Sequence, residues 1–317
     1  MDAIGGYFEL EFRKGNHYHN KEALKLNTAR NCFEYVLRAR HYRKVYMPYY
    51  TCEVLLEPIN KLGIDYEFYR INEILEPIEL PKLEETEAFL YTNYFGLKQK
   101  CVKYLVEVYG NQLIVDNAQA FYTKPIAGID TFYSPRKFFG VPDGAYLYTE
   151  KRLEQDFEKD VSYNRMSHLL KRIDVGAGFG FQDFRTNDES LCNQEIKRMS
   201  KLTNLILSGI DYDEIKQKRR ENYAFLDSIL KESNQLHLQL DDESVPMAYP
   251  YWSNDTLLKQ KMIDYKIFVP TYWPNVLEWC KPEDWEYELA DKTAFVPIDQ
   301  RYSIVDMQKI NDVIINY

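Results

Sequence analysis

The first half of the chain alternates between helical and strand-like patterns of apolar residues. Three stretches carry apolar residues at helical spacing: 28–42, 51–63 and 98–110. Four short apolar runs lie between and after them: 44–48, 64–71, 87–96 and 112–116. The second and third helical stretches end in Gly63 and Gly110, as helices commonly do. This alternation predicts an α/β fold in which a mostly parallel sheet is sandwiched by helices.

The second half of the chain has a different pattern. Residues 151–200 are polar, rich in Arg, Asp and Asn, and give few strand signals. Four patterned segments follow: a helical stretch over 199–232 broken near Gly209, strand-like pieces at 245–252 and 266–273, and a last helix at 306–317. We therefore expect a large domain over residues 1–214 and a small C-terminal α+β domain over residues 215–317.

Charge and cysteine content narrow the class of protein. The formal net charge of −9 disfavours non-specific binding to nucleic acid, and we interpret the basic run 216–220 as the solvated face of a helix. The five cysteines are scattered, without the spacing of a metal site, as in reduced cytosolic proteins. We see neither a signal peptide nor an apolar run long enough to span a membrane. We expect a soluble, cytoplasmic protein that binds neither nucleic acid nor membranes and has no metal site.

One glycine-rich motif is set aside. The run 176–181, GAGFGF, is similar to a dinucleotide-binding loop, but it follows no strand and opens no convincing helix. We interpret it as a flexible or tightly packed loop. The sequence contains no GxSxG, HExxH or Walker motif, and its five histidines are scattered, so hydrolase and metalloenzyme chemistry is weakly supported.

Polar side chains occur where an α/β fold binds its ligands, near the carboxyl ends of apolar strands. Asp116 ends the run 112–116, and Gln119 follows one turn later. A carboxylate in such a place is costly unless a cation or hydrogen-bond donors satisfy it. Lys137 lies 21 residues beyond Asp116 (137 − 116), at a turn between two apolar strands. Taken singly, these residues are ordinarily a strand cap and a solvated surface lysine.

The start of the first predicted helix is the third candidate feature. Thr28 is a suitable N-cap, and Ala29 and Arg30 follow it. A helix N-terminus with a hydroxyl and an arginine is a ready site for an anion. A lysine, a carboxylate and a phosphate site are together what pyridoxal 5'-phosphate requires. The lysine forms the Schiff base, the carboxylate keeps the pyridine nitrogen protonated, and the helix end takes the phosphate.

The segments around these residues resemble a known family. VDNAQAF at 115–121 and FYSPRKFFGVPDGAYLYT at 132–149 are similar to the DegT/StrS-type pyridoxal-phosphate-dependent nucleotide-sugar aminotransferases. TARNCFEYVLRA at 28–39 is similar to that family's phosphate-binding helix start, and FVPIDQRYSIVDMQKINDVI at 295–314 to its C-terminal segment and last helix. The resemblance runs over most of the chain. It implies the type I fold of the pyridoxal-phosphate-dependent transferases, which aspartate aminotransferase also has.

The resemblance implies a role for each candidate residue. Lys137 would be the Schiff-base lysine and the acid/base that transfers the proton. Asp116 would pair with the pyridine nitrogen, and Gln119 would contact the oxygen on the cofactor ring. The residues expected at the phosphate are Thr28, Ala29, Arg30 and Ser134.

The chain departs from the family pattern at several places. The usual Ser-Gly-Thr of the phosphate site is replaced by residues 28–30, and the serine five residues before the lysine is Phe132. The aromatic residue that commonly stacks on the cofactor ring falls near Cys52. We therefore expect Tyr50 or Tyr94 to stack on the ring instead.

Because Lys137 is present, the expected reaction is transamination. An amine from a donor such as glutamate would pass to a keto-sugar, linked to a nucleotide, for surface polysaccharide biosynthesis. The resemblance also implies a homodimer, since this fold builds its site across a subunit interface. Two alternatives remain open at this point. One is a binding or regulatory protein that keeps the fold without catalysis, and the other is a pyridoxal-phosphate enzyme with a non-sugar substrate.

Overall fold

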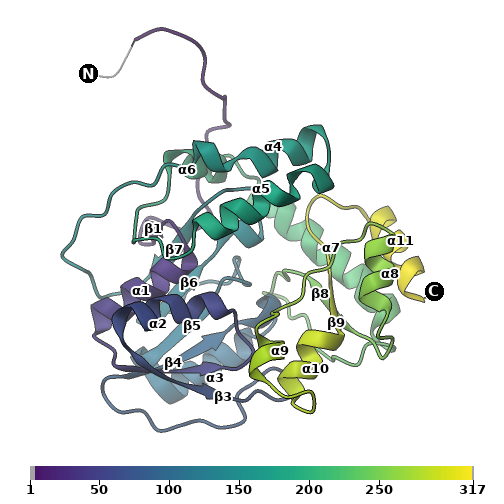
Figure 1. Cartoon of the computed structure of the whole chain (residues 1–317), viewed down its shortest axis with the longest axis horizontal. Coiled ribbons are helices and arrows are strands. Elements are labelled where there is room, and N and C mark those ends of the chain that lie inside the picture. The colour runs from purple at the N-terminus through teal and green to yellow at the C-terminus, as the bar shows by residue number, and fades with distance from the viewer. Residues whose placement is uncertain (1–3, 316–317) are drawn as a thin grey trace.

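The computed structural model of the chain describes residues 4–315 and contains a seven-stranded sheet (Figure 1). In spatial order its strands are β1 (Leu24–Leu26), β7 (Ala145–Tyr148), β6 (Asp130–Tyr133), β5 (Leu113–Asn117), β4 (Glu87–Thr92), β2 (Lys44–Pro48) and β3 (Asp65–Tyr69). β7 runs antiparallel to both of its neighbours, and the other pairings are parallel. The predicted mostly parallel sheet is confirmed. This order brings the carboxyl ends of β4, β5 and β6 to one edge.

Helices cover both faces of the sheet. These are α1 (Ala29–Arg40) and α2 (Leu56–Leu62) on one face and α3 (Gln99–Tyr109) on the other. Ile114 of β5 packs in the same apolar cluster as residues of α1 and α2, whereas Leu113 and Val115 pack in the larger cluster that includes α3. Because side chains alternate along a strand, an unbroken apolar run must be buried on both sides.

The first helix begins, and the second ends, where the sequence predicts. The side chain of Thr28 accepts a hydrogen bond from the backbone N–H of Asn31 and caps α1. The stretch 51–63 opens with a single 3₁₀ turn at 53–55 and continues as α2, which ends at Gly63 with a φ of 63°. The N-terminus of α1 is thereby fixed beside the sheet.

A helical hairpin occupies the polar middle of the chain (Figure 1). It consists of α4 (Ser167–Asp174) and α5 (Ala177–Ser190). Because Gly176 caps the N-terminus of α5, the interpretation of run 176–181 as a loop is wrong. The glycines serve close packing there: a Cβ on Gly180 would lie 2.8 Å from the backbone oxygen of His168 in α4.

The C-terminal part differs from expectation in one element. Its first pieces are α6 (Lys201–Ser208), α7 (Tyr212–Leu230), β8 (Tyr249–Trp252) and β9 (Thr293–Val296). The predicted break near Gly209 is confirmed. β8 pairs antiparallel with β9, so the prediction of a strand at 266–273 is wrong. Apolar residues of that segment, such as Ile267 and Val269, instead pack on the core from irregular backbone.

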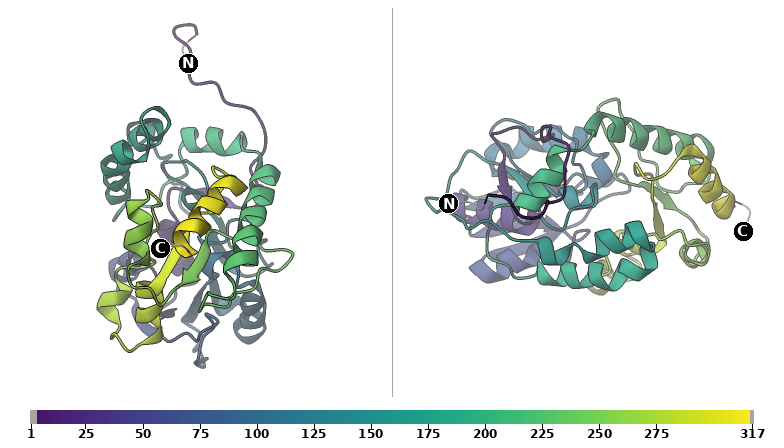
Figure 2. Two further views of the ribbon diagram at one scale, coloured as in Figure 1. Left: turned by 90° about the vertical axis from the view of Figure 1, so that its right-hand side faces the viewer. Right: turned by 90° about the horizontal axis from the view of Figure 1, so that it is seen from above.

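The remaining helices complete the C-terminal part. They are α8 (Leu258–Asp264), α9 (Val276–Trp279), α10 (Trp285–Lys292) and α11 (Ile304–Ile315). α11 packs against α7 and α8 (Figure 2) and confirms the predicted last helix, of which residues 316 and 317 lie outside the described part. The predicted boundary after residue 214 falls within α7, and the division into two domains stays a prediction. No helix within residues 4–315 is long and apolar enough to cross a membrane.

The basic run on α7 is only partly solvated. Arg219 is 1% exposed, and its guanidinium lies 4.6 Å from the ring centre of Phe138 and donates to the backbone oxygen of Met247 at 3.0 Å. Burial lowers the pKa of Arg219 to about 10. The interpretation of the whole run as a solvated face is therefore wrong at Arg219, which packs against the residue that follows Lys137.

Candidate active site

Asp116 lies at the carboxyl end of β5 and is buried there. One of its oxygens accepts a hydrogen bond from the backbone N–H of Ala118 at 2.8 Å. Burial raises the pKa of Asp116 to about 6, against the opposing effects of the Ala118 N–H and of the positive charge on Lys137. The carboxylate is thus only partly compensated by the protein, which distinguishes it from an ordinary strand cap.

Lys137 ends a single 3₁₀ turn, Pro135–Lys137, that follows β6 directly. Proline favours the start of such a turn, and its carbonyl accepts the N–H of Phe138 at 2.9 Å. The ammonium nitrogen lies 5.2 Å from the ring centre of Tyr272. Because β5 and β6 are parallel neighbours, their carboxyl ends meet, and Lys137 comes near Asp116 despite the intervening residues.

A cavity of about 160 Å³ collects most of the candidate residues. Those that line it are Thr28, Ala29, Arg30, Asp116, Gln119, Ser134 and Lys137. Its volume suits a six-membered ring, since a cavity of ~150 Å³ holds benzene. The three features that the sequence singled out therefore converge on one site.

Two candidate residues, Tyr50 and Tyr94, are not among the residues that line the cavity. Both are fully buried, with ring centres 5.5 Å apart, and the Tyr94 hydroxyl donates to the backbone oxygen of Tyr50 at 2.9 Å. Both rings pack inside the apolar core, so the expectation that one of them stacks on a ligand is not met. Trp273, which contacts Tyr50, lines the cavity in front of them.

The N-terminus of α1 forms the cationic end of the cavity. The hydroxyl of Thr28 caps the helix and donates to the side chain of Asn31 at 2.6 Å. The guanidinium of Arg30 is paired with Glu57, and the residue also lines the cavity. The positive end of a helix dipole together with a buried guanidinium favours an anion at this point.

A second guanidinium at this end was not foreseen from the sequence. Arg136 donates to the carboxylate of Asp188 on α5 at 3.0 Å, and both residues line the cavity. Its buried Nε has no hydrogen-bond partner within residues 4–315. Burial lowers the pKa of Arg136, the carboxylate of Asp188 opposes this effect, and the nearby charge of Arg30 adds to it. The only available signal was position: Arg136 immediately precedes Lys137.

Gln119 carries an unused donor. Its carbonyl oxygen accepts the backbone N–H of Phe95 at 3.1 Å, which fixes the amide, and its buried Nε2 finds no partner in the described part of the chain. The residue is only 1% exposed. A buried donor without a partner is unfavourable, and such groups call for a specific explanation. A ligand acceptor in the cavity would provide one.

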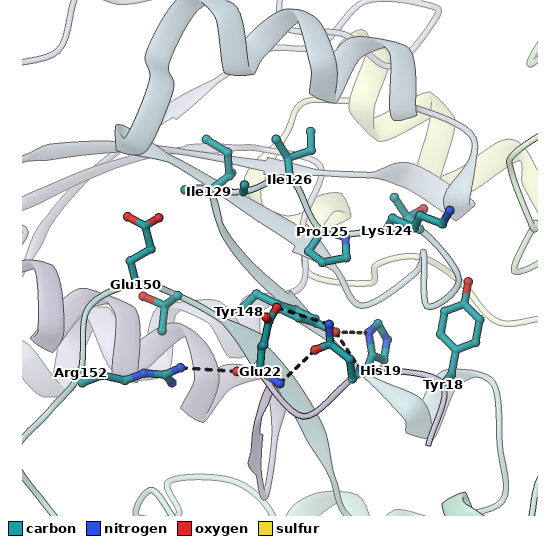
Figure 3. Close-up of a pocket in the computed structure, with 15 residues that line it drawn as sticks. Tyr18, His19, Glu22, Lys124, Pro125, Ile126, Ile129, Tyr148, Glu150 and Arg152 are labelled. Atoms are coloured by element: carbon teal, nitrogen blue, oxygen red, sulfur yellow. Dashed lines mark hydrogen bonds between the residues drawn. The ribbon is translucent and has the colours of Figure 1, made fainter. Parts of the chain in front are cut away.

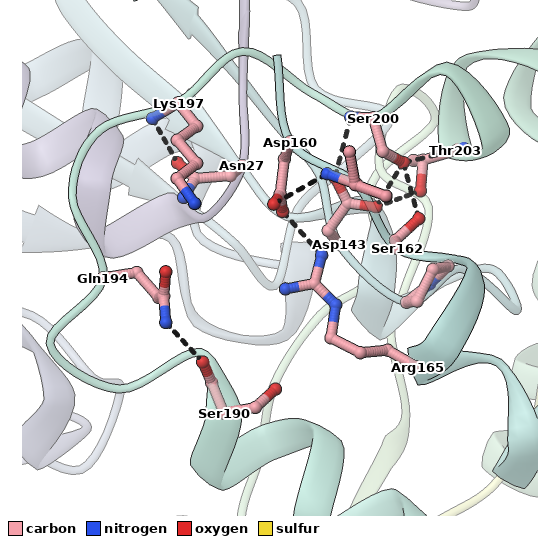
Figure 4. A network of polar contacts seen from close by, with 12 residues as sticks. Asn27, Asp143, Asp160, Ser162, Arg165, Ser190, Gln194, Lys197, Ser200 and Thr203 are labelled. Carbon is pink, nitrogen blue, oxygen red and sulfur yellow. Dashed lines mark hydrogen bonds and ion pairs between the residues drawn. The ribbon is translucent and has the colours of Figure 1, made fainter. Parts of the chain in front are cut away.

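The turn after Lys137 is held by a buried carboxylate (Figure 4). Asp143 accepts from the backbone N–H of Ser200 at 2.9 Å, from the Ser200 hydroxyl at 2.7 Å and from the hydroxyl of Thr203. Gly144, which lines the cavity, has a φ of 112°, and a Cβ there would meet the Thr203 side chain at 3.0 Å. The N-terminus of α6 thus locks the Asp-Gly turn beneath the lysine.

A larger hollow of about 680 Å³ lies elsewhere, around His19 and Tyr148 (Figure 3). Burial lowers the pKa of His19 to about 3, although a hydrogen bond with the Phe121 backbone opposes the effect. The charged residues that line this hollow are all exposed: Glu22, Lys124, Glu150 and Arg152. Among the described residues that line the hollow there is no buried carboxylate facing an amine, so the smaller cavity is the better candidate for catalysis.

The architecture is shared with solved structures. The sugar aminotransferase CalS13 of Micromonospora echinospora is similar with a TM-score of 0.61 at 14% sequence identity, over 92% of this chain and 86% of that one. The chain has the fold of the sugar aminotransferases. S. venezuelae DesV, solved in complex with a ketimine intermediate, shares that fold with a TM-score of 0.65 at 15% identity, over 92% of this chain and 83% of that one.

A third structure with the sugar-aminotransferase fold is Spr1654 of Streptococcus pneumoniae in its PLP-form, with a TM-score of 0.61 at 13% identity, over 92% of this chain and 86% of that one. No protein-family model and no curated protein sequence matches the chain. At these identities the likeness concerns the fold, and the predicted type I fold is confirmed. Function must be argued from the cavity itself.

Proposed function

We propose that the protein is a pyridoxal-phosphate-dependent aminotransferase. The observation that carries the proposal is the meeting of Lys137 and the buried Asp116 in one cavity with the N-terminus of α1. Pyridoxal phosphate supplies an aldehyde that bonds to amines and a ring that accepts electrons. The solved proteins Spr1654 in PLP-form and DesV with a ketimine intermediate lend support through the shared fold.

The residues of the cavity fit the three parts of this cofactor. The carboxylate of Asp116, with its pKa raised to about 6, forms no ion pair within residues 4–315, and a protonated pyridine nitrogen would provide one. The unpartnered Nε2 of Gln119 suits the oxygen on the ring. Arg30, Arg136 and the helix N-terminus suit the phosphate. Each of these groups in the cavity thus has a counterpart in the ligand.

Lys137 would hold the cofactor and serve as the acid/base of the reaction. Its amine extends from a short turn fixed by Pro135 and by the Asp143 network, and the side chain, although exposed, lines the cavity. A proton at the substrate carbon must be taken and returned within hydrogen-bond distance, which a lysine on such a turn can do. Ser134, which also lines the cavity, lies at the start of the same turn.

We propose a keto-sugar, linked to a nucleotide, as the acceptor and an amino acid such as glutamate as the donor. DesI, solved in the presence of its TDP-sugar product, and CalS13, a sugar aminotransferase, have the same fold. The product would serve surface polysaccharide biosynthesis. All five cysteines are free, as is typical of proteins that function in the reducing cytoplasm.

We propose further that the protein acts as a homodimer. The α4–α5 hairpin exposes large apolar side chains, among them Ile173 at 81%, Phe179 at 73% and Phe181 at 61%. Such a patch commonly marks a protein–protein interface. α5 also carries Asp188, so a partner on this hairpin would lie next to the cavity.

The test is to add pyridoxal phosphate to the purified protein and record its visible absorption. We expect a band from the lysine-bound cofactor, and borohydride reduction followed by peptide mapping should place the label on Lys137. Addition of glutamate should then convert the band to that of the pyridoxamine form. Protein that stays colourless refutes the proposal. Colour without conversion by any amino donor would favour a non-catalytic binding protein.

A screen of keto-acids and keto-sugar nucleotides identifies the acceptor. The pyridoxamine form is mixed with each compound, and return of the original band is recorded. We expect return with keto-sugar nucleotides. Return with keto-acids alone would favour the non-sugar alternative.

A further inference from the structure

One wall of the cavity comes from a distant part of the chain. Of the described residues that line the cavity, Trp273 is the one that lies beyond residue 188. It belongs to the irregular segment 266–273 and is 7% exposed. The described chain beyond residue 188 therefore reaches the cavity through a single large aromatic side chain.

Specific contacts hold this segment in place. The side-chain amide of Asn275 donates to the backbone oxygen of Thr51 at 2.9 Å, and its carbonyl oxygen accepts the backbone N–H of Glu53 at 3.4 Å. These contacts straddle Cys52, which also lines the cavity. Trp273 is thus docked beside Cys52, whose thiol offers no aromatic surface.

The indole is also braced from behind. The ring centre of Trp273 lies 5.1 Å from that of Tyr50 at an interplanar angle of 61°, an edge-to-face contact. Tyr50 in turn packs on Tyr94. The neighbouring Tyr272 has its ring centre 5.2 Å from the amine of Lys137. The orientation of the indole is therefore set before any ligand binds, and it is set close to the reactive amine.

We propose that Trp273 is the surface on which the flat ring bound at Lys137 stacks, and that Tyr50 and Tyr94 act on the ring only by bracing the indole. This inference rests on the proposed function. The other aromatic residue in the lining, Phe132, is fully buried in β6 and packs with Phe33 of α1. Trp273 is the aromatic side chain that is not already enclosed by the sheet and α1.

The proposal gives the C-terminal segment a role in cofactor retention. A flat aromatic ring gains both buried area and a stacking contribution from the indole. Loss of that surface should weaken binding of pyridoxal phosphate by at least about tenfold, because stacking alone contributes on the order of one such factor. The same change should leave the covalent attachment site unchanged.

The experiment measures the dissociation constant of pyridoxal phosphate for the wild type and four variants by absorption titration. Trp273→Leu keeps an apolar side chain but removes the ring, whereas Trp273→Phe keeps a smaller ring. Asn275→Ala loosens the docking of the segment. Trp279→Phe is the matched control, since Trp279 packs on Phe68 and does not line the cavity. Thermal unfolding of each cofactor-free variant reports whether it folds.

We expect Trp273→Leu to raise the dissociation constant about tenfold or more, Asn275→Ala less, and Trp273→Phe about threefold or less. Cofactor binding should quench tryptophan fluorescence in the wild type and in Trp279→Phe, but markedly less in Trp273→Phe. Near-wild-type affinity for Trp273→Leu, or unchanged quenching in Trp273→Phe, overturns the inference. If Trp273→Leu fails to fold, the quenching of tryptophan fluorescence in Trp273→Phe tests the inference instead.

The two proposals fail in different ways. If the wild type forms no borohydride-reducible bond at Lys137, the proposed function and this inference both fall. If the wild type labels Lys137 normally and the Trp273 variants bind with unchanged affinity, only the stacking assignment falls.

Discussion

The cavity at Lys137 and the larger hollow at His19 bury opposite kinds of titratable group. The first has a volume of about 160 Å³ and buries a carboxylate whose pKa is raised to about 6. The second has about 680 Å³ and buries an imidazole whose pKa is lowered to about 3. The neutral imidazole packs among aromatic rings and leaves its Nε2 without a partner in the described residues, whereas the carboxylate keeps an incompletely satisfied charge. Volume is therefore a poor guide to the site, and an uncompensated charge is a better one.

The two groups give opposite pH dependences of stability. For Asp116 the folded-state pKa lies above the unfolded value of 3.8, so its contribution to stability is full below about pH 4 and is lost as the pH rises through about 6. For His19 the folded-state pKa lies below the unfolded value of 6.5, so stability is lost as the pH falls from about 6.5 toward 3.

Replacement of Lys137 should give the largest difference in activity between a variant in the cavity and a variant in the larger hollow. Lys137→Ala should lower transaminase activity by about 10³-fold or more, because a positioned acid/base and the cofactor bond are both removed. The matched control is Lys124→Ala in the larger hollow, which should keep activity within about twofold. Steady-state kinetics with the acceptor found by the screen measures both. Equal losses in the two variants would contradict the assignment of the site.

Replacement of Asp116 tests how much burial of its carboxylate lowers the unfolding free energy of the cofactor-free protein. From about pH 3 to about pH 7 the unfolding free energy of the cofactor-free Asp116→Asn variant should rise relative to the wild type by about 3 kcal/mol, from a pKa shift of roughly two units. Above about pH 7 the difference should stay constant. Denaturant unfolding at several pH values measures it. The same variant should bind pyridoxal phosphate more weakly, so stability and binding change in opposite directions. A pH-independent difference would refute the burial argument.

Replacement of His19 should change how the unfolding free energy depends on pH only at acidic pH. At pH 4 the wild type should have lost about 3 kcal/mol through His19, and His19→Leu should remove that loss. For each protein, the unfolding free energy at pH 4 is subtracted from that at pH 7. This difference cancels the pH-independent destabilisation caused by loss of the contact with Tyr148. Cofactor affinity should be unaffected. An acid-side loss of the same size in both proteins would show that His19 is protonated without penalty.

Removal of the Asp188 carboxylate should have the smallest effect. Its side chain is 53% exposed, so its ion pair with Arg136 contributes less than about 1 kcal/mol. Asp188→Asn should free Arg136 and raise affinity for pyridoxal phosphate about two- to fivefold, without changing affinity for pyridoxal, which lacks the phosphate. Glu22→Gln at the larger hollow is the control. An equal gain for both ligands would argue against a phosphate at Arg136.

Much of the fold and of the polar half of the site could be predicted from the sequence. Local patterns carry these features: the apolar run 112–116 ends in Asp116, and Thr28 caps a helix. Two predictions failed in segments that are placed by tertiary contacts. The run 176–181 begins a helix that packs closely on α4 at Gly180, and the stretch 266–273 is irregular backbone while β9 pairs with β8. Neither neighbour is visible in a local pattern.

The sequence by itself determined the sheet, the capped first helix and the placing of Asp116 and Lys137 at strand ends. Alternating burial and helix capping depend on residues that are close in sequence, so a local pattern is enough to predict them. Only the tertiary structure decided which aromatic side chain faces the cavity. Tyr50 is close in sequence to the site but is enclosed by the core, whereas Trp273 is brought in by contacts of Asn275 with residues 51 and 53. Long-range packing of that kind depends on how the C-terminal segment docks, which spacing along the chain does not specify.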